Sequence, residues 1–417
     1  MADRLRQAGG VDPLELDVAR IRACFPSLAE GAAHFDGPGG SQVPESVGRA
    51  VADTLCSAIA NRGGGDLTPA ERRTDAAVVG ARAAIADLLG AVPDGVVFGR
   101  SMTQLTFDLA RTMAKGWGPG DEVVVTRLDH DGNIRPWVRA AEAVGATVRW
   151  ADFDPATAEL AVEAVSSLVS ERTRVVAITG ASNLLGTRPD VPAVAAAAHA
   201  AGALVYVDAV HLVPHVPVDV RAMGADFLAC SPYKFLGPHL GAVVADPALL
   251  ETLHPDKLLP STEVVPERFE LGTLPYELLA GTTAAVDFIA GLLPGEGGDR
   301  RSRVLASMAA LEALEARLFE RLLDGLSSIE GVTRHGRPAR RTPTVLFSVA
   351  GRTPSSVSEA LAAAGVNAPD GNFYALEAAR WMGLGDTGAV RAGLAPYTDE
   401  DDIDRLLQAL EDHSRSS

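Results

Sequence analysis

Short runs rich in β-branched residues alternate with alanine-rich amphipathic stretches between about residue 95 and residue 245. The runs predict strands at Gly95–Phe98, Glu122–Thr126, Thr147–Trp150, Arg174–Thr179, Ala203–Val207, Asp226–Ala229 and Gly241–Ala245. The stretches between them predict helices, among them Thr103–Ala114, Ile134–Val144, Ala158–Val169 and Val191–Ala200. Such alternation is typical of an α/β fold whose mostly parallel sheet is covered by helices on both faces. Because ligands of open α/β sheets bind beyond the carboxyl ends of the strands, we expect the functional site there.

The pattern changes after Gly281, and a chain of 417 residues is long enough for two domains. The later part predicts helices over Arg303–Leu326, Ser355–Ala364 and about Asp399–Glu411, and a strand at Val345–Val349. We therefore predict a large domain over residues 35–290 and a smaller α/β domain over residues 291–417. Residues 1–34 are expected to pack with the smaller domain.

Charge and cysteine content narrow the function classes. The net charge is −17 and the 37 basic residues form no stripe, which disfavours nucleic acid and anionic membranes as partners. The N-terminus is polar and the longest apolar tract, residues 191–210, contains polar residues, so neither a signal peptide nor a membrane span is expected. Cys24, Cys56 and Cys230 are too scattered for a disulfide framework or a metal site. We expect a cytoplasmic protein.

Lys234 and Asp208 follow two neighbouring predicted strands. A lysine amine can form a Schiff base with an aldehyde, and an aspartate can keep a pyridine nitrogen protonated. These are the two protein groups that pyridoxal phosphate (PLP) needs most. Taken alone, the pair fits an unrelated surface lysine and strand-end carboxylate equally well.

Residues after other predicted strands could serve the same cofactor. The segment Gly99–Gln104 opens a helix and offers hydroxyls and backbone N–H groups to a phosphate, although a hydroxyl there is often only a helix cap. Ser231 is a second hydroxyl that could reach this phosphate. His130 could stack on the pyridine ring, although a lone histidine is often an ordinary polar residue. Asn183 and His211 could contact the phenolic oxygen of the cofactor, and Asn183 also a substrate carboxylate.

Eight segments together resemble the class V aminotransferase family of PLP enzymes, which have fold type I, and within it the cysteine-desulfurase-like branch. They occur in the order of the family, at Phe35–Ser41, Arg100–Gln104, Asp129–Trp137, Ser182–Thr187, Asp208–His211, Ser231–Lys234, Phe269–Thr273 and Val390–Leu394. The resemblance implies a seven-stranded sheet in the large domain, a homodimer with shared active sites and an amino acid as substrate.

The resemblance also assigns roles to individual residues. Lys234 would carry the cofactor and move the Cα proton, Asp208 would pair with the ring nitrogen, and His130 would stack on the ring. The implied cofactor contacts are Met102, Thr103, His130, Asn183, Asp208, His211, Ser231, Tyr233, Lys234 and Thr273, the last reaching the phosphate of the partner subunit. Arg391 would bind the substrate carboxylate, a task that suits its bidentate fork.

The chain departs from the desulfurases at the loop that should carry their nucleophilic cysteine. This loop, near residues 370–376, contains no cysteine, and none occurs after Cys230. Cys230 ends a predicted strand, where a packing role is expected. Tyr233 replaces the histidine usual before the lysine, and could bind phosphate, act as an acid or merely pack beside the cofactor. Asn372, Tyr374 and the segment Gly37–Ser41, including Ser41, are expected at the substrate entrance.

These observations predict a PLP enzyme that acts through an external aldimine and a quinonoid. The reaction we expect is β-elimination of an S-substituted cysteine, a C–S lyase reaction without a persulfide. Transamination or epimerisation on the same scaffold is the alternative, and the intact Lys234, Asp208 and Arg391 disfavour a non-catalytic homologue. No metal is expected, since Pro214 interrupts the His211–His215 spacing. The side chain of the substrate is left open.

Overall fold

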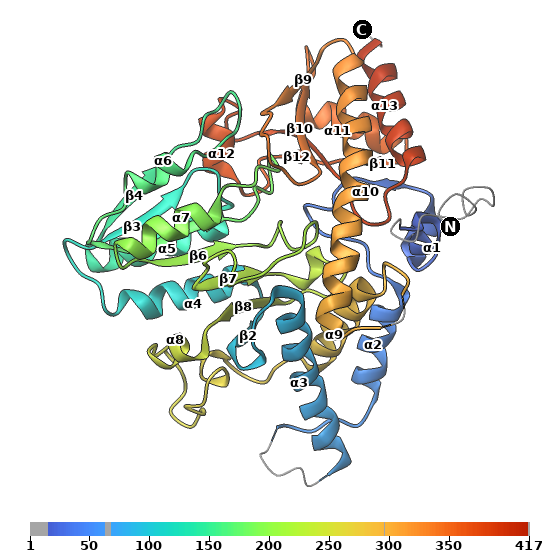
Figure 1. The fold of residues 1–417 in the computed structure, drawn as a ribbon. Helices are drawn as coiled ribbons and strands as arrows, with labels where there is room; N and C mark the ends of the chain where they lie inside the picture. Colours follow the sequence, from blue (N-terminus) through green and yellow to red (C-terminus); the bar gives the residue numbers. More distant parts are fainter. Residues whose placement is uncertain (1–15, 63–67, 296, 416–417) are drawn as a thin grey trace, which may run out of the picture.

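A seven-stranded sheet forms the centre of the computed structural model, which describes residues 16–62, 68–295 and 297–415 (Figure 1). Its strands lie in the order β2 (Val96–Gly99), β8 (Gly241–Ala245), β7 (Phe227–Cys230), β6 (Leu204–Asp208), β5 (Thr173–Thr179), β3 (Glu122–Thr126) and β4 (Thr147–Ala151). β8 runs antiparallel to both of its neighbours, whereas the pairings from β7 to β4 are parallel. The prediction of a mostly parallel seven-stranded sheet is confirmed.

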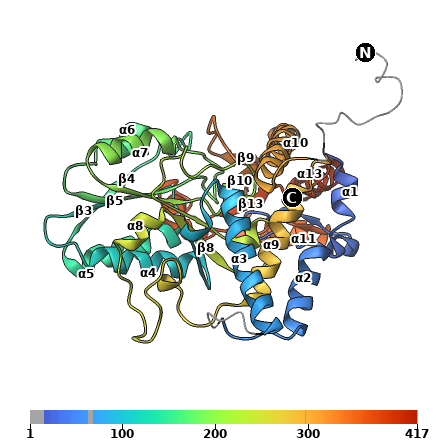
Figure 2. The same cartoon turned by 60° about the horizontal axis from the view of Figure 1, so that its bottom comes forward.

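Alternate residues of these strands pack against different helices. Val123 and Val125 join the apolar cluster of α4 (Met102–Ala114) and α5 (Arg135–Val144), whereas Val124 joins the cluster of α3 (Pro69–Leu89), α7 (Val191–Ala200) and α9 (Tyr276–Ala290). The two-residue period of a strand explains this division. Figure 2 shows α4 and α5 on one side of the sheet, with α7 and α6 (Val162–Ser166) on the other.

A second, antiparallel sheet lies in the C-terminal part of the chain. Its order is β12 (Asp370–Gly371), β13 (Ala389–Gly393), β10 (Thr344–Val349) and β9 (Val332–His335). The helices α11 (Pro354–Ala363) and α13 (Glu400–Arg415) pack on each other beside it, and α12 (Leu376–Trp381) precedes β13. This arrangement supports the proposed small domain over residues 291–417.

The N-terminal segment contacts this smaller unit. β1 (Ala33–His34) pairs in parallel with β11 (Val366–Asn367), and Arg22 of α1 (Val18–Arg22) forms ion pairs with Asp399 at 3.0 Å and Asp402 at 2.6 Å. Of the proposed segment 1–34, residues 1–15 lie outside the described residues. These contacts support the proposed association of the segment with the small domain.

The long helix α10 (Arg300–Ser328) joins the two parts of the molecule (Figure 1). It packs against α3 and α9 near its start and against α13 and β9 near its end, so one apolar core runs through both parts. α2 (Glu45–Cys56) packs on α9, and the short helix α8 (Pro247–Glu251) follows β8.

One predicted helix is shorter than expected. The prediction over Ala158–Val169 is wrong at both ends, because α6 covers Val162–Ser166. The Asp154 side chain accepts hydrogen bonds from the Ala156 N–H and the Thr157 hydroxyl, each at 2.9 Å, and Ala158 has a φ of 66°. A side chain that closes a turn in this way competes with the helix for the backbone.

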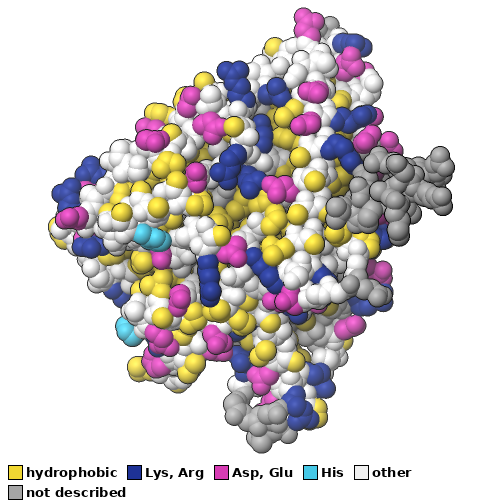
Figure 3. Space-filling view, viewed as in Figure 1, with side chains coloured by type: hydrophobic (Ala, Val, Ile, Leu, Met, Phe, Trp, Pro, Cys, Tyr) yellow, Lys and Arg dark blue, Asp and Glu magenta, His cyan; other side chains and the backbone are white. Residues whose placement is uncertain are grey.

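The surface carries charges of both signs. On the face shown in Figure 3, Lys and Arg side chains are interspersed with Asp and Glu side chains. Within the described ranges, none of the helices combines the length and the apolar character that crossing a bilayer requires.

Candidate active site

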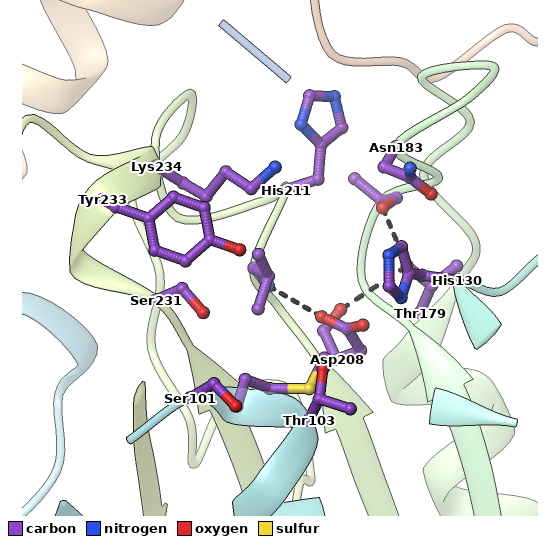
Figure 4. A pocket seen from close by; sticks show the side chains of 13 residues that line it. Ser101, Thr103, His130, Thr179, Asn183, Asp208, His211, Ser231, Tyr233 and Lys234 are labelled. Carbon is purple, nitrogen blue, oxygen red and sulfur yellow. Dashed lines mark hydrogen bonds between the residues drawn. The ribbon is translucent and has the colours of Figure 1, made fainter. Parts of the chain in front are cut away.

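The candidate active site lies where the parallel strands end. β6 ends at Asp208, β5 ends shortly before Asn183, β3 leads to His130, and β7 leads to Lys234. A cavity lies between these strand ends and is here called the inner cavity. It is lined by Ser101, Met102, Thr103, His130, Thr179, Ala181, Asn183, Asp208, Val210, His211, Ser231, Tyr233 and Lys234 (Figure 4). All of the cofactor contacts predicted from the sequence, except Thr273, therefore meet here.

Lys234 extends its amine into this cavity from the turn that follows β7 (Figure 4). The Nζ atom donates a hydrogen bond to the carbonyl oxygen of Pro38. Burial lowers the pKa of Lys234 to about 7, and the positive charge of Arg391 acts in the same direction. Since the neutral amine is the form that attacks an aldehyde, the environment of Lys234 suits a Schiff-base lysine.

Asp208 is buried at the end of β6, between Lys234 and His130 (Figure 4). Burial raises the pKa of Asp208 to about 6, while the Val210 N–H, at 2.9 Å from Oδ1, and the nearby Lys234 act in the opposite direction. The carboxyl group is therefore mostly ionised at neutral pH. An ionised, buried acceptor in this position suits a protonated pyridine nitrogen.

His130 faces Lys234 across the cavity (Figure 4). Its Nδ1 accepts a hydrogen bond from the Gly132 N–H at 2.9 Å, so Nε2 carries the proton of the neutral ring. Burial lowers the pKa of His130 to about 4, with a further contribution from the charge of Lys234. The ring is thus neutral at physiological pH. A Cβ atom at residue 132 would lie 2.9 Å from Nδ1, so glycine is needed there.

Asp129, a buried residue for which the sequence predicted no role, supports the loop that carries His130. Asp129 accepts hydrogen bonds from the Thr126 hydroxyl and from the Asn133 side chain, the latter at 2.7 Å. Burial raises the pKa of Asp129 to about 8, and the nearby Asp208 raises it further. Asp129 is therefore largely protonated at neutral pH. Its spacing of four residues from Asn133, within one of the family segments, is the signal that could have identified the pair.

The opposite end of the inner cavity offers groups for a phosphate. α4 begins after Ser101, whose side chain caps it by accepting the Gln104 N–H at 3.1 Å, and Met102 and Thr103 form its first turn. The N-terminus of a helix attracts anions through its free N–H groups and its dipole. The Ser231 and Tyr233 hydroxyls lie at the same end (Figure 4).

Two buried polar atoms that line the inner cavity lack a partner. Asn183 Oδ1 and His211 Nδ1 have no hydrogen-bond partner among the described residues. The other ring nitrogen of His211, Nε2, lies 2.9 Å from the Thr344 hydroxyl and 3.1 Å from that of Thr342. Buried polar atoms normally have partners, so these two atoms are available to a ligand. The inner cavity thus combines the amine of Lys234, the carboxylate of Asp208, an anion site and free polar atoms. This set of groups fits PLP.

A larger cleft opens from the inner cavity and shares Thr103, His130, Asn183, Tyr233 and Lys234 with it. This outer cleft has an empty volume of about 1150 Å³. It is further lined by Asp36, Pro38, Gly39, Phe107, Asp131, Gly132, Arg135, Pro369, Phe373, Tyr374 and Arg391. Of these residues, Pro38, Gly39, Tyr374 and Arg391 were expected at the substrate from the sequence. Asp36, Phe107, Phe373 and Arg135 were missed, because a sequence does not show which distant residues meet.

Arg391 lies at the base of the outer cleft and is 1% exposed. Its Nη2 donates to Asp36 Oδ1 at 2.7 Å, its Nη1 donates to the Asn183 carbonyl at 3.0 Å, and its guanidinium lies 3.7 Å from the centre of the Phe373 ring. Burial lowers the pKa of Arg391 to about 10, and Asp36 opposes this shift. The residue predicted to bind a substrate carboxylate thus already binds a carboxylate of the protein.

Three predicted site residues line neither the inner cavity nor the outer cleft. Ser41 accepts the Leu236 N–H at 2.8 Å and donates to the Tyr233 carbonyl at 3.2 Å, so it supports the lysine loop from behind. Asn372 donates to the Asp386 carbonyl at 2.7 Å and accepts the Tyr374 N–H at 3.0 Å. Ser41 and Asn372, expected at the substrate entrance, therefore hold backbone instead. Thr273 is exposed on the surface.

None of the three cysteines lines either cavity. Cys230 is 0% exposed, and burial raises the pKa of its thiol to about 12. Cys24 is half-buried and Cys56 is exposed, and neither lines the inner cavity or the outer cleft. A thiol this deeply buried and this weakly acidic is a poor nucleophile.

Comparison with known proteins identifies the class. The Aminotransferase class-V family profile matches residues 33–406. An uncharacterized protein of Mycobacterium tuberculosis is 37% identical, covering 94% of this chain and 98% of that protein, and "Probable cysteine desulfurase 2" of Mycobacterium leprae is 32% identical, with coverages of 95% and 96%. The structure of the cysteine desulfurase CsdA from Escherichia coli superimposes with a TM-score of 0.83 at 26% identity, covering 95% and 98% of the two chains.

The chain therefore belongs to the class V aminotransferase family and has fold type I. It is a PLP-dependent enzyme of the cysteine-desulfurase-like kind.

Proposed function

We propose that the enzyme catalyses β-elimination of an S-substituted L-cysteine. One molecule of substrate and one of water give a thiol, pyruvate and ammonium. The C–S bond breaks, the sulfur leaves with the electron pair and takes up a proton, and water releases the nitrogen as ammonium. The balance requires no oxidant and no second amino acid. PLP, when bound, supplies the electron sink that makes the Cα proton acidic.

The residues of this chain would divide the work as follows. Lys234 would hold the cofactor and would remove the Cα proton, since burial lowers the pKa of its amine to about 7 and so favours a base near neutral pH. Asp208 keeps the ring nitrogen protonated, and His130 covers the ring. Arg391 binds the substrate carboxylate, with Asn183 beside it. Met102, Thr103, Ser231 and Tyr233 hold the phosphate, and His211 contacts the phenolic oxygen.

The observation that carries this proposal is the state of the cysteines. A desulfurase needs a mobile cysteine that takes sulfur from the substrate. Here the loop of residues 370–376 contains none, and the thiol closest to Lys234 in the sequence, that of Cys230, is fully buried. This supports a reaction in which the substrate sulfur leaves with its own substituent instead of passing to the protein.

We also propose that the enzyme is a homodimer. Leu258, Leu259, Val264 and Leu271 are exposed, Leu259 completely, in the segment that leads to Thr273. Several exposed apolar side chains within one segment are consistent with a protein interface. A partner seated there would bring Thr273 towards its phosphate site. Light scattering should give twice the chain mass, and Thr273→Ala should weaken PLP retention without changing that mass.

We place the enzyme in the cytoplasm, where its three free cysteines suit a reducing compartment.

The test of the reaction is product analysis with the PLP-loaded enzyme and S-methyl-L-cysteine. Thiol, pyruvate and ammonium in equal amounts would support β-elimination, and Lys234→Ala should abolish all three. A keto acid that retains the sulfur and appears only with an amino acceptor would show transamination instead. Loss of the substrate's optical activity without thiol release would show epimerisation.

A further inference from the structure

The outer cleft has an aromatic wall that the chemistry of PLP does not require. Phe107, Phe373 and Tyr374 line it, and Phe107 follows Thr103 by one turn of α4, so that both face the same cavity. The Tyr374 ring centre lies 5.6 Å from that of His130 at an interplanar angle of 39°. Pro38 and Pro369 add rigid apolar surface. The lining therefore suits an apolar group with a flat face.

The loop that carries two of these rings is held in an unusual conformation. Phe373 and Tyr374 have φ values of 52° and 60°, a region that bulky residues rarely occupy. Two hydrogen bonds retain it: the Asn183 side chain donates to the Phe373 carbonyl at 2.9 Å, and the Asp131 N–H donates to the Tyr374 carbonyl at 2.7 Å. Local strain that the surroundings maintain is characteristic of functional loops. Here it presents Phe373 to Arg391 and leaves Tyr374 75% exposed at the mouth of the cleft.

The charges of the cleft are already paired. Arg135 lies 2.6 Å from Asp131 and 2.8 Å from Glu377, and Arg391 lies 2.7 Å from Asp36. Among the described residues that line the outer cleft, the charged side chains other than Lys234 thus have an opposite charge in contact. A charged substituent would lose its hydration without gaining a free counter-ion.

We propose that the substrate carries a flat, uncharged aromatic or heteroaromatic group on its sulfur, and that this group lies against Phe107 and Tyr374. The proposal rests on the β-elimination proposed above. Free cysteine carries no substituent on its sulfur that could contact these rings. Desulfurases have their nucleophilic cysteine in the loop that corresponds to residues 370–376. In this enzyme the same loop would instead supply aromatic rings that select the leaving group.

The test compares three substrates of the PLP-loaded enzyme: S-benzyl-, S-methyl- and S-carboxymethyl-L-cysteine. Benzyl and methyl thiols are both alkyl leaving groups, so a difference between them reports mainly on binding. Pyruvate release gives kcat/KM, and the change in visible absorption of bound PLP gives a dissociation constant that does not depend on elimination. We expect kcat/KM for the benzyl compound to exceed that of the methyl compound at least ~10-fold, with a parallel change in dissociation constant. The anionic compound should be the poorest.

Two variants link the preference to the wall. Phe107→Ala should lower the kcat/KM for the benzyl compound several-fold more than that for S-methyl-L-cysteine. Phe107→Leu, which retains apolar volume without the flat ring, should fall between wild type and Phe107→Ala. Equal constants for the benzyl and methyl compounds, or an equal loss of both in Phe107→Ala, would overturn the proposal. If neither substrate releases thiol but the absorption titration still favours the benzyl compound, β-elimination fails and the aromatic site stands.

Discussion

The Nη2 atom of Arg391 lies 2.7 Å from Asp36 Oδ1, although 355 residues separate the two in the chain. The guanidinium is buried, and its Nε has no hydrogen-bond partner among the described residues. Asp36 thus occupies one side of the fork that the substrate carboxylate is expected to use. A buried guanidinium needs a counter-charge, and Asp36 provides it when the substrate is absent.

Asp36→Asn should therefore change binding and stability in opposite directions. Without a competing carboxylate, the substrate should bind more tightly, by about 10-fold, as expected for a buried charge-assisted contact. Without substrate, the variant should lose about 1–3 kcal/mol of unfolding free energy, less than for a fully buried pair because the Asp36 side chain is 33% exposed. Thermal melting with and without a non-reactive amino acid measures both effects. A ligand-induced rise in Tm no larger than in wild type would contradict this role, and Asp36→Glu, which keeps the charge, is the matched control.

The pKa of Lys234, lowered to about 7 by burial, predicts how the PLP-free enzyme takes up its cofactor. The protonated amine cannot attack the aldehyde, so the rate of Lys234–PLP bond formation should rise about 10-fold per pH unit below pH 7 and level off above it. Rapid mixing of PLP-free enzyme with PLP, followed by visible absorption, measures this rate. A rate that still rises 10-fold per unit at pH 9 would indicate an ordinary lysine.

The strands of the large domain could be predicted to within about one residue because most of them are buried on both faces and several are rich in β-branched residues. The polar residues at their ends were predictable for the same reason, since parallel strands bring their carboxyl ends together. The bounds of the helix expected over residues 158–169 could not be predicted. The Asp154 side chain closes a turn there that helical periodicity does not reveal.

Several residues that line the outer cleft could not be predicted from the sequence. Phe107 looks like any apolar residue on a helix face, and Phe373 follows a Gly-Asn pair that suggests only a loop. The two residues line one cleft because the tertiary fold brings α4 and a loop more than 250 residues later to the same site, which local patterns do not encode. The pairing of Asp36 with Arg391 depends on the same long-range packing.

Asp129 should make the stability of the enzyme depend on pH. Burial raises the pKa of Asp129 to about 8 in the folded state, from its ordinary value of 3.8. The folded state therefore keeps a proton that the unfolded state loses, and this contribution to the unfolding free energy is present below about pH 4 and lost as the pH rises through about 8. In Asp129→Asn the contribution is absent. Melting temperatures between pH 5 and pH 8.5 should fall more steeply in wild type than in the variant, and parallel curves would contradict a protonated Asp129.

Replacement of Cys230 tests whether sulfur ever passes to the protein. Because its thiol is 0% exposed and burial raises its pKa to about 12, Cys230→Ala should form pyruvate from S-methyl-L-cysteine at nearly the wild-type rate. Loss of the buried sulfur should cost about 1–2 kcal/mol of stability, which is visible as a lower Tm. Cys56→Ala, at the exposed end of α2, is the control for the general effects of losing a thiol. With L-cysteine as substrate, sulfide release that disappears in Cys230→Ala and persists in Cys56→Ala would establish a persulfide carried by Cys230 and overturn direct elimination.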